Sequence, residues 1–244
     1  MTRVFTLLYG IVCYLAGFLA LLYAIGFVEN LIVPKSIDSG ASGPLVPSLI
    51  INAALLGIFA IQHSVMARPG FKAWWTKFVS PPAERSTYVL FAALALTLLF
   101  YFWQPLQSLI WNVAVQPVAQ ALTILSFVGW AILFLSTFMI NHFELFGLQQ
   151  VFARLLGRSA EPLEFRTPFF YAFVRHPIYL GLIIAFWATP HMTLGHLEFA
   201  IATTGYIFIG IAFEERDLVA HFGEQYQSYR RRVSMIIPWL PKAN

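Results

Sequence analysis

An arginine, a histidine and a proline precede an apolar segment late in the chain, and two acids end the next apolar segment. The residues are Arg175, His176 and Pro177, followed by Glu214 and Glu215. Proline suits the first turn of a helix, where its missing N–H costs nothing. Arg175 and His176 would then lie beside the free N–H groups and the positive dipole end of a helix, which favour a carboxylate or a phosphate. The two glutamates would accept hydrogen bonds from hydroxyl or ammonium groups.

These donors and acceptors together indicate a ligand that has an anionic end, hydroxyl groups and a positive charge. S-adenosylmethionine has a carboxylate, an ammonium, ribose hydroxyls and a sulfonium, so we predict it as the cofactor. Spacing alone supports a second interpretation equally well. In that interpretation Arg175 pairs with Glu214 or Glu215 only to hold two helices together.

Further polar side chains lie at the ends of other apolar segments. His63 ends the second segment, Arg85 and Ser86 begin the third, and His142 and Glu144 follow the fourth. Polar groups are costly in a membrane unless they face a cavity or a partner, so their positions are informative. We expect a single site, open to the cytoplasm, that draws on these residues together with the Arg-His step and the glutamate pair.

The composition identifies the chain as an integral membrane protein. Hydrophobic residues make up 59% of the chain, charged residues 11%, and the mean hydropathy is +0.72. In soluble proteins about a quarter of residues are charged. Apolar runs close to the ~20 residues that cross a bilayer lie at Val4–Val28, Val46–Met66, Thr87–Trp103, Val118–Ile140, Pro177–Pro190 and Leu197–Phe213. We predict an all-α protein with five to six transmembrane helices, because the last two runs are short enough to form a tilted pair or a hairpin.

The distribution of basic residues predicts the orientation. Six spans would place both termini on one side, and 14 of the 15 Lys and Arg residues fall on that side, leaving Lys35 opposite. The 14 are Arg3, Arg68, Lys72, Lys77, Arg85, Arg154, Arg158, Arg166, Arg175, Arg216, Arg230, Arg231, Arg232 and Lys242. We predict a bacterial inner-membrane protein with both termini and the active site in the cytoplasm. The net charge of +4 then reflects orientation and contact with anionic lipid headgroups, and no nucleic-acid partner is expected.

The chain shows no internal repeat, and we predict a single membrane domain over residues 1–244 with the cofactor signature within about 141–233. Near the C-terminus Phe222, Tyr226, Tyr229 and Val233 recur at helical spacing, while the arginines at 230–232 point elsewhere around the same turns. This pattern predicts an amphipathic helix that lies in the membrane interface, with its aromatic side chains at headgroup level.

The cysteine and histidine residues do not indicate a metal centre. Cys13 is the single cysteine, which excludes an intramolecular disulfide and a cysteine-rich metal site. The histidines lack the spacing of one helical turn that typical metal-binding pairs show. We predict no bound metal.

Three late motifs resemble the C-terminal signature of isoprenylcysteine carboxyl methyltransferases and their membrane relatives. They are RHPIYLG at 175–181, EERDL at 214–218 and FGEQYQSY at 222–229, and they match in order and spacing over about 60 residues. The resemblance implies an S-adenosylmethionine pocket that faces the cytoplasm. The cofactor-binding residues that we assign on this basis are Glu144, Gln149, Tyr171, Val174, Arg175, His176, Tyr179, Gly181, Glu214 and Glu215.

Three earlier motifs resemble the nurim-like branch of that superfamily, which includes bacterial methanethiol S-methyltransferases. They are QHSVMAR at 62–68, ERSTYVL at 84–90 and NHFELFGLQQ at 141–150. The resemblance implies methylation of a small thiol, with methanethiol giving dimethyl sulfide. A thiolate is the nucleophile in such a transfer, so a basic or cationic neighbourhood would assist ionisation. His63, Arg85 and His142 are the candidate catalytic residues.

Two other functions are compatible with the sequence. The same cofactor could methylate a lipid or a prenylcysteine carboxylate, which would require a lateral opening for the tail. Alternatively, the chain could be a structural or regulatory membrane protein that has the fold without catalysis. The sequence does not predict an oligomeric state.

Overall fold

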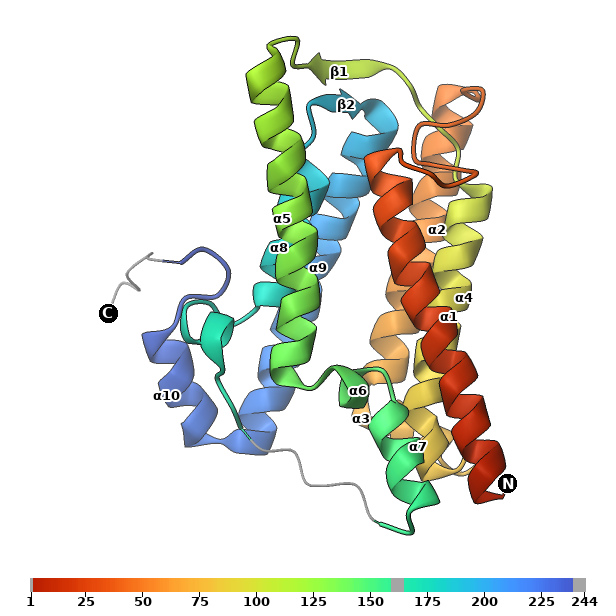
Figure 1. Cartoon of the computed structure of the whole chain (residues 1–244), viewed down its shortest axis with the longest axis vertical. Coiled ribbons are helices and arrows are strands. Elements are labelled where there is room, and N and C mark those ends of the chain that lie inside the picture. Colours follow the sequence, from red (N-terminus) through yellow and green to blue (C-terminus); the bar gives the residue numbers. More distant parts are fainter. Residues whose placement is uncertain (1, 159–164, 239–244) are drawn as a thin grey trace. The chain divides into compact units, whose positions relative to one another are not determined.

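The computed structural model describes residues 2–158 and 165–238, so Lys242, one of the 14 basic residues, lies outside the described part. The elements (Figure 1) are α1 Arg3–Glu29, α2 Leu45–Ala67, α3 Pro69–Trp75, α4 Pro81–Phe102, β1 Leu109–Asn112, α5 Gln116–Ile140, α6 His142–Leu145, α7 Leu148–Leu155, the 3₁₀ helix η1 Phe169–Ala172, α8 Pro177–Trp187, β2 His191–Thr193, α9 Leu194–Phe222 and α10 Glu224–Arg232. Within the described residues, five helices are long and apolar enough to cross a membrane: α1, α2, α4, α5 and α9. The prediction of an all-α membrane protein is confirmed.

The chain forms two compact units. Unit 1 consists of Met1–Ser108, His142–Pro162 and Thr193–Phe199, and unit 2 consists of Leu109–Asn141, Leu163–Met192 and Ala200–Asn244. Unit 1 therefore contains α1 to α4, α6 and α7. Unit 2 contains α5, η1, α8, most of α9, and α10.

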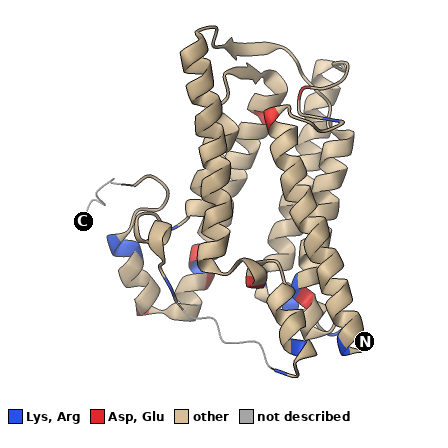
Figure 2. Ribbon diagram, viewed as in Figure 1, with Lys and Arg blue, Asp and Glu red and all other residues tan. Residues whose placement is uncertain are grey.

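Helix α4 is the centre of unit 1, because it packs against both α1 and α2, and the short helix α7 packs on α1 and α4. Pro81 and Pro82 occupy the first turn of α4, where proline favours helix initiation. The turn before α7 depends on Gly147, whose φ of +85° suits glycine, and a Cβ there would lie 2.7 Å from the Ser86 nitrogen. Figure 2 shows that the basic residues of this unit lie mainly at the end where α1 begins.

In unit 2, α8 runs antiparallel to α5 with the two backbones in contact. A Cβ on Gly181 would lie 2.5 Å from the Gly129 carbonyl oxygen, and the Ser126 hydroxyl donates to the Ala185 carbonyl at 2.9 Å. Helix α8 has 11 residues, about 16 Å at 1.5 Å per residue, which is too short to cross a bilayer. The segment after α8 nevertheless reaches the segment before α5. There the Val113 amide donates a hydrogen bond to the Pro190 carbonyl at 2.9 Å.

Helix α9 is longer than the sequence suggested. It has 29 residues, about 43 Å, whereas the hydrocarbon layer is about 30 Å thick. The apolar run ends at Phe213, but the helix continues through the charged residues at 214–217 to Phe222. Of the two spans expected to be short, the first is short and the second is long enough to cross.

The predicted amphipathic helix near the C-terminus is α10. Its tyrosines, Tyr226 and Tyr229, are buried, and their rings lie within 6.0 Å of the Phe165 ring, centroid to centroid. These two aromatic residues therefore pack inside the protein. They are part of the packing of unit 2, and the exposed face of α10 carries Arg231 and Arg232.

Candidate functional site

The Arg-His step before α8 is held by the chain that follows α10. Val174 forms a parallel bridge with Ser234. The Arg175 amide donates to the Ser234 carbonyl at 2.8 Å, and the His176 amide donates to the Met235 carbonyl at 3.1 Å. Two segments that are about 60 residues apart in sequence thus fix the direction of both side chains.

Arg175 forms a buried ion pair with Glu215 of α9. Its Nε lies 2.6 Å from Glu215 Oε1, and Arg175 and Glu215 are only 7% and 6% exposed. One terminal nitrogen of the same guanidinium donates to the Val233 carbonyl at 2.5 Å and to the Arg230 carbonyl at 3.2 Å. Arg175 therefore joins the start of α8, α9 and the end of α10, which is the helix-holding role that spacing alone also allowed.

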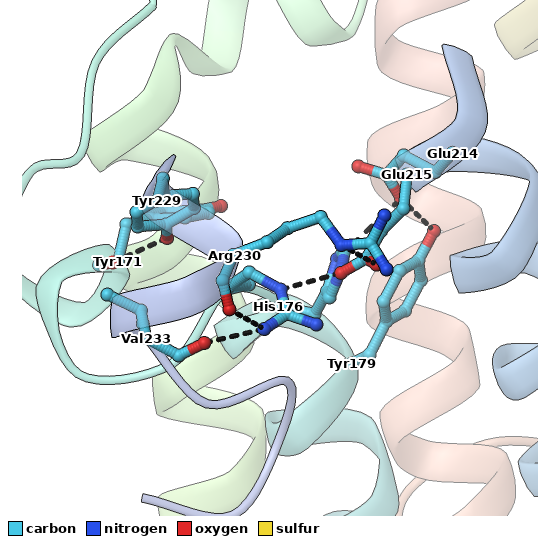
Figure 3. Close-up of polar contacts among 9 residues, drawn as sticks. Tyr171, His176, Tyr179, Glu214, Glu215, Tyr229, Arg230 and Val233 are labelled. Atoms are coloured by element: carbon cyan, nitrogen blue, oxygen red, sulfur yellow. Dashed lines mark hydrogen bonds and ion pairs between the residues drawn. The ribbon is translucent and has the colours of Figure 1, made fainter. Parts of the chain in front are cut away.

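His176 and Arg230 complete the surroundings of Glu215 (Figure 3). His176 Nε2 lies 3.1 Å from Glu215 Oε1, and since a carboxylate only accepts hydrogen bonds, this nitrogen carries the proton. Arg230 Nε lies 3.1 Å from the other oxygen, Oε2. Both oxygens of Glu215 thus have cationic or N–H partners within the protein.

Glu214 has a different environment although it is the next residue. Its side chain is 44% exposed. It accepts a hydrogen bond from the Tyr179 hydroxyl at 3.0 Å, and His176 Nδ1 lies 3.9 Å away (Figure 3). Glu214 is the acid of this cluster that can reach a ligand.

Three tyrosines lie beside these charges. The Tyr229 hydroxyl donates to the Tyr171 carbonyl at 2.5 Å, and the Tyr171 hydroxyl donates to the Ser136 carbonyl at 3.5 Å. The Tyr226 hydroxyl is buried and has no hydrogen-bond partner among the described residues. Burial raises the pKa of all three phenols, and the negative charge of Glu215 adds to this effect at Tyr226. The hydroxyls therefore stay protonated and can act as donors.

Sequence reasoning placed Tyr226 in the membrane interface and did not assign it to the site. A buried hydroxyl without a protein partner costs free energy, so such a group is a candidate to bond a ligand or a water molecule. The motif FGEQYQSY contained Tyr226, but helical spacing alone could not distinguish a buried tyrosine from an interfacial one.

The candidate catalytic residues His63 and Arg85 belong to unit 1 and meet at Tyr88. The Tyr88 hydroxyl lies 2.8 Å from His63 Nε2, and the Arg85 guanidinium carbon lies 4.8 Å from the centre of the Tyr88 ring. Arg85 Nε also donates to the Leu145 carbonyl at 2.8 Å. Tyr88 therefore connects the two predicted residues, although no pattern in the sequence singled it out.

His142, also in unit 1, is paired with Tyr14 of α1. The Tyr14 hydroxyl lies 3.0 Å from His142 Nε2, and the imidazole packs on Phe146 with ring centres 4.7 Å apart. Burial lowers the pKa of His142, so the ring is neutral at neutral pH. A neutral imidazole can accept a proton.

The ten predicted cofactor residues divide between the units. Unit 2 brings together Tyr171, Val174, Arg175, His176, Tyr179, Glu214 and Glu215. Gly181 belongs to unit 2 but faces α5, where it permits helix packing. Glu144 and Gln149 are half-buried residues of unit 1.

Metal binding has no support in the described part of the chain. Residues 2–158 and 165–238 contain no group of three or more His, Cys, Asp or Glu side chains that could hold a metal ion.

Comparison with known protein families identifies the family to which the chain belongs. The model of the family described as NnrU protein matches residues 51–235, which include the unit 2 cluster and the three earlier motifs at 62–68, 84–90 and 141–150. The chain belongs to the NnrU family.

The chain is also similar to individual proteins of known name. The chain is 60% identical to methanethiol S-methyltransferase 1 of Bradyrhizobium diazoefficiens over 95% of its own length and 81% of the relative. It is 52% identical to methanethiol S-methyltransferase of Mycobacterium tuberculosis over 98% of each chain. Nurim of Rattus norvegicus is 31% identical over 71% of this chain and 69% of the relative. No solved structure matches the chain.

Proposed function

We propose that the protein is a membrane methyltransferase that uses S-adenosylmethionine to convert methanethiol to dimethyl sulfide. The observation that carries this proposal is the 52% identity to a methanethiol S-methyltransferase over 98% of both chains. This alignment covers the motifs around His63, Arg85 and His142, and it also covers those of the unit 2 cluster. The proposal treats residues 1–244 as one membrane domain to which both units contribute.

The cluster in unit 2 has the donors and acceptors that the cofactor needs. Glu214 is exposed enough to accept hydrogen bonds from an ammonium or from ribose hydroxyls. The buried Tyr226 hydroxyl lacks a partner in the described structure. The start of α8, beside His176, is the positive end of the helix dipole, which favours a carboxylate. The bound cofactor would supply an electrophilic methyl group on its sulfonium.

In this proposal Arg175 and Glu215 position the cofactor-binding groups and do not bind the cofactor themselves. Both side chains are buried. Both oxygens of Glu215, and Nε and one terminal nitrogen of Arg175, bond to each other, to His176 and Arg230, or to backbone carbonyls. Tyr229, bonded to the Tyr171 carbonyl, holds η1 against α10 in the same way.

The acceptor thiol is assigned to His63, Arg85 and His142 on the strength of the motif resemblance. Methyl transfer needs the sulfur held in line with the methyl group and shielded from water, so most of the rate comes from positioning and desolvation. A neutral imidazole at His142 can take the thiol proton, and the positive charge of Arg85 favours the thiolate. A small apolar thiol partitions into the bilayer, which explains a membrane location for the enzyme.

We propose a bacterial inner-membrane location with both termini and the active site in the cytoplasm. The excess of Lys and Arg on one side supports this orientation, as does the position of Lys35, which is bonded to the Tyr101 carbonyl at the far end of α4 from Arg85. Cys13 is buried, so added cysteines can be labelled selectively. Ala41→Cys should react with an impermeant reagent in intact cells and Gln225→Cys only after permeabilisation; reaction of both in intact cells would overturn the orientation.

The test of the function is an assay of the purified protein in lipid nanodiscs with methyl-labelled S-adenosylmethionine. Methanethiol should yield labelled dimethyl sulfide in the headspace. Parallel reactions with a phospholipid and with a prenylcysteine examine the alternative acceptors. Transfer to none of the acceptors, in a protein that is folded and binds no S-adenosylmethionine, would support the non-catalytic alternative.

A further inference from the structure

A groove in unit 2 lies between α9 and the chain that ends α10. Its volume is about 460 Å³, within the ~300–1,000 Å³ of ligand sites. One part of its wall is apolar and is formed by Phe208, Ile211, Ala212 and Met235. Another part is basic and is formed by Arg216 and Arg230. Methanethiol, with one carbon and one sulfur atom, is far too small to fill this space.

The order of residues along α9 indicates how deep in the membrane the groove lies. Phe208, Ile211 and Ala212 belong to the apolar part of the helix, whereas Arg216 belongs to the charged run at 214–217, where the helix leaves the hydrocarbon. The apolar wall is therefore at acyl-chain level and the two arginines are at headgroup level.

Among the residues that line the groove, two are basic and one is acidic. Arg230 pairs with Glu215 Oε2 at 3.1 Å, but its side chain remains 44% exposed. The Arg216 guanidinium lies over the Phe213 ring, 5.8 Å from its centre, on the exposed surface of the helix. The single carboxylate in the groove wall, Glu215, is also paired with Arg175, so the two arginines leave positive charge for an anion.

We propose that this groove binds one acidic phospholipid, with the phosphate on Arg216 and Arg230 and an acyl chain along Phe208, Ile211, Ala212 and Met235. A planar guanidinium fork suits a phosphate oxygen pair. The inference concerns lipid binding and does not depend on the proposed reaction.

The experiment measures retained lipid by native mass spectrometry of the full chain in detergent, titrated with phosphatidylglycerol and with phosphatidylcholine of the same acyl chains. Phosphatidylglycerol should bind more tightly. Arg216→Gln should weaken its binding about fivefold, since one basic residue contributes about 1 kcal/mol near an anionic headgroup. Ala212→Trp should abolish binding by filling the groove.

Matched controls come from residues outside the groove. Arg231→Gln removes an arginine that pairs with Glu224, and Ala220→Trp adds a tryptophan at another exposed position of α9; both should bind phosphatidylglycerol as the wild type does. Equal binding of the two lipids, or unchanged phosphatidylglycerol binding in Arg216→Gln and Ala212→Trp, would overturn the proposal. A loss of S-adenosylmethionine binding in the lipid-free Ala212→Trp protein would assign the groove to the cofactor, and methylation of the lipid would make it a substrate; either result also overturns it.

Discussion

Arg175 Nε lies 2.6 Å from Glu215 Oε1, and both residues are almost fully excluded from solvent. The neighbouring acid, Glu214, is bonded to Tyr179 and remains 44% exposed. Two adjacent glutamates thus have different roles, because successive residues of a helix point about 100° apart. Glu215 faces the arginine that holds α8 to α10, and Glu214 faces outward.

Replacing Arg175 should destabilise the fold. Arg175→Ala leaves the buried Glu215 carboxylate with only His176 and Arg230 as partners, and it removes the hydrogen bonds to the Val233 and Arg230 carbonyls. These losses together should cost about 3–5 kcal/mol. The free energy of unfolding in denaturant should fall by that amount. Arg231→Ala, at an exposed pair with Glu224, should change it by less than about 1 kcal/mol. A fully stable Arg175→Ala protein would show that the pair does not hold the helices.

Replacing Glu214 should affect cofactor binding with little effect on stability. Glu214→Gln keeps the shape but removes the charge that accepts an ammonium or hydroxyl, so calorimetry should show S-adenosylmethionine binding weaker by about 1.5–3 kcal/mol. The melting temperature should stay near the wild-type value, because the side chain is 44% exposed and glutamine can still accept the hydrogen bond from Tyr179. Unchanged affinity would remove Glu214 from the site.

The Tyr226 hydroxyl should matter for ligand binding and not for folding. It has no hydrogen-bond partner in the described structure, so Tyr226→Phe should leave the free energy of unfolding unchanged or slightly raised. The same variant should bind S-adenosylmethionine several-fold more weakly. Tyr229→Phe is the comparison, because it breaks the bond to the Tyr171 carbonyl and should lower stability. Unchanged affinity with normal folding would exclude Tyr226 from the site.

The sequence predicted the helices well where the apolar run and the helix begin and end at nearly the same residues. It predicted α1, α2 and α5 to within a few residues but began the third helix at Thr87, whereas Pro81 begins it. Charged residues at 84 and 85 lower the hydropathy without disfavouring a helix. The charged residues at 214–217 likewise explain why the predicted apolar run ended at Phe213, although α9 continues to Phe222. Hydropathy reports the membrane boundary, and a helix can extend beyond it.

The site was predictable in its residue types but not in its pairing. The motifs identified Arg175, His176, Glu214 and Glu215, yet they could not show which glutamate is buried, because this depends on the chain at Val233–Met235 that closes against α8. Tyr88 and Tyr14, the partners of His63 and His142, were not predicted either, since each comes from a different helix. Such contacts are long-range and leave no local pattern.

Stability should depend on pH through His142. Burial lowers its pKa in the folded state, while in the unfolded chain a histidine titrates near 6.5. The unfolded state therefore binds more protons as the pH falls below about 6.5, and the folded state loses stability by at most ~1.4 kcal/mol per pH unit until the folded pKa is reached. His142→Phe should remove this part of the pH dependence, measured by denaturant unfolding between pH 5 and 8. His221→Gln, at an exposed histidine, should retain it, and an identical profile for wild type and His142→Phe would contradict the assignment.

The acceptor site can be tested separately from the cofactor site. His63 and Arg85 meet at Tyr88 in unit 1, whereas the proposed cofactor-binding groups Glu214 and Tyr226 belong to unit 2. His63→Ala and Arg85→Ala should therefore lower kcat with methanethiol by about 10²–10⁴-fold if they assist proton removal or thiolate formation, and S-adenosylmethionine affinity should stay within about twofold. Tyr88→Phe should give a smaller loss, since the ring that Arg85 packs on is kept.

Acceptor size decides between a small-thiol site and a lipid-methylating one. The ratio kcat/KM measures differential stabilisation of the transition state, so it is the quantity to compare across methanethiol, longer alkanethiols and a prenylcysteine. For a methanethiol enzyme this ratio should be highest for the smallest thiol and should fall as the chain grows beyond the pocket. His63→Ala should lower the ratio for every thiol by a similar factor, because it acts on the sulfur and not on the tail. A higher kcat/KM for the prenylcysteine would refute the methanethiol assignment while leaving the methyltransferase assignment intact.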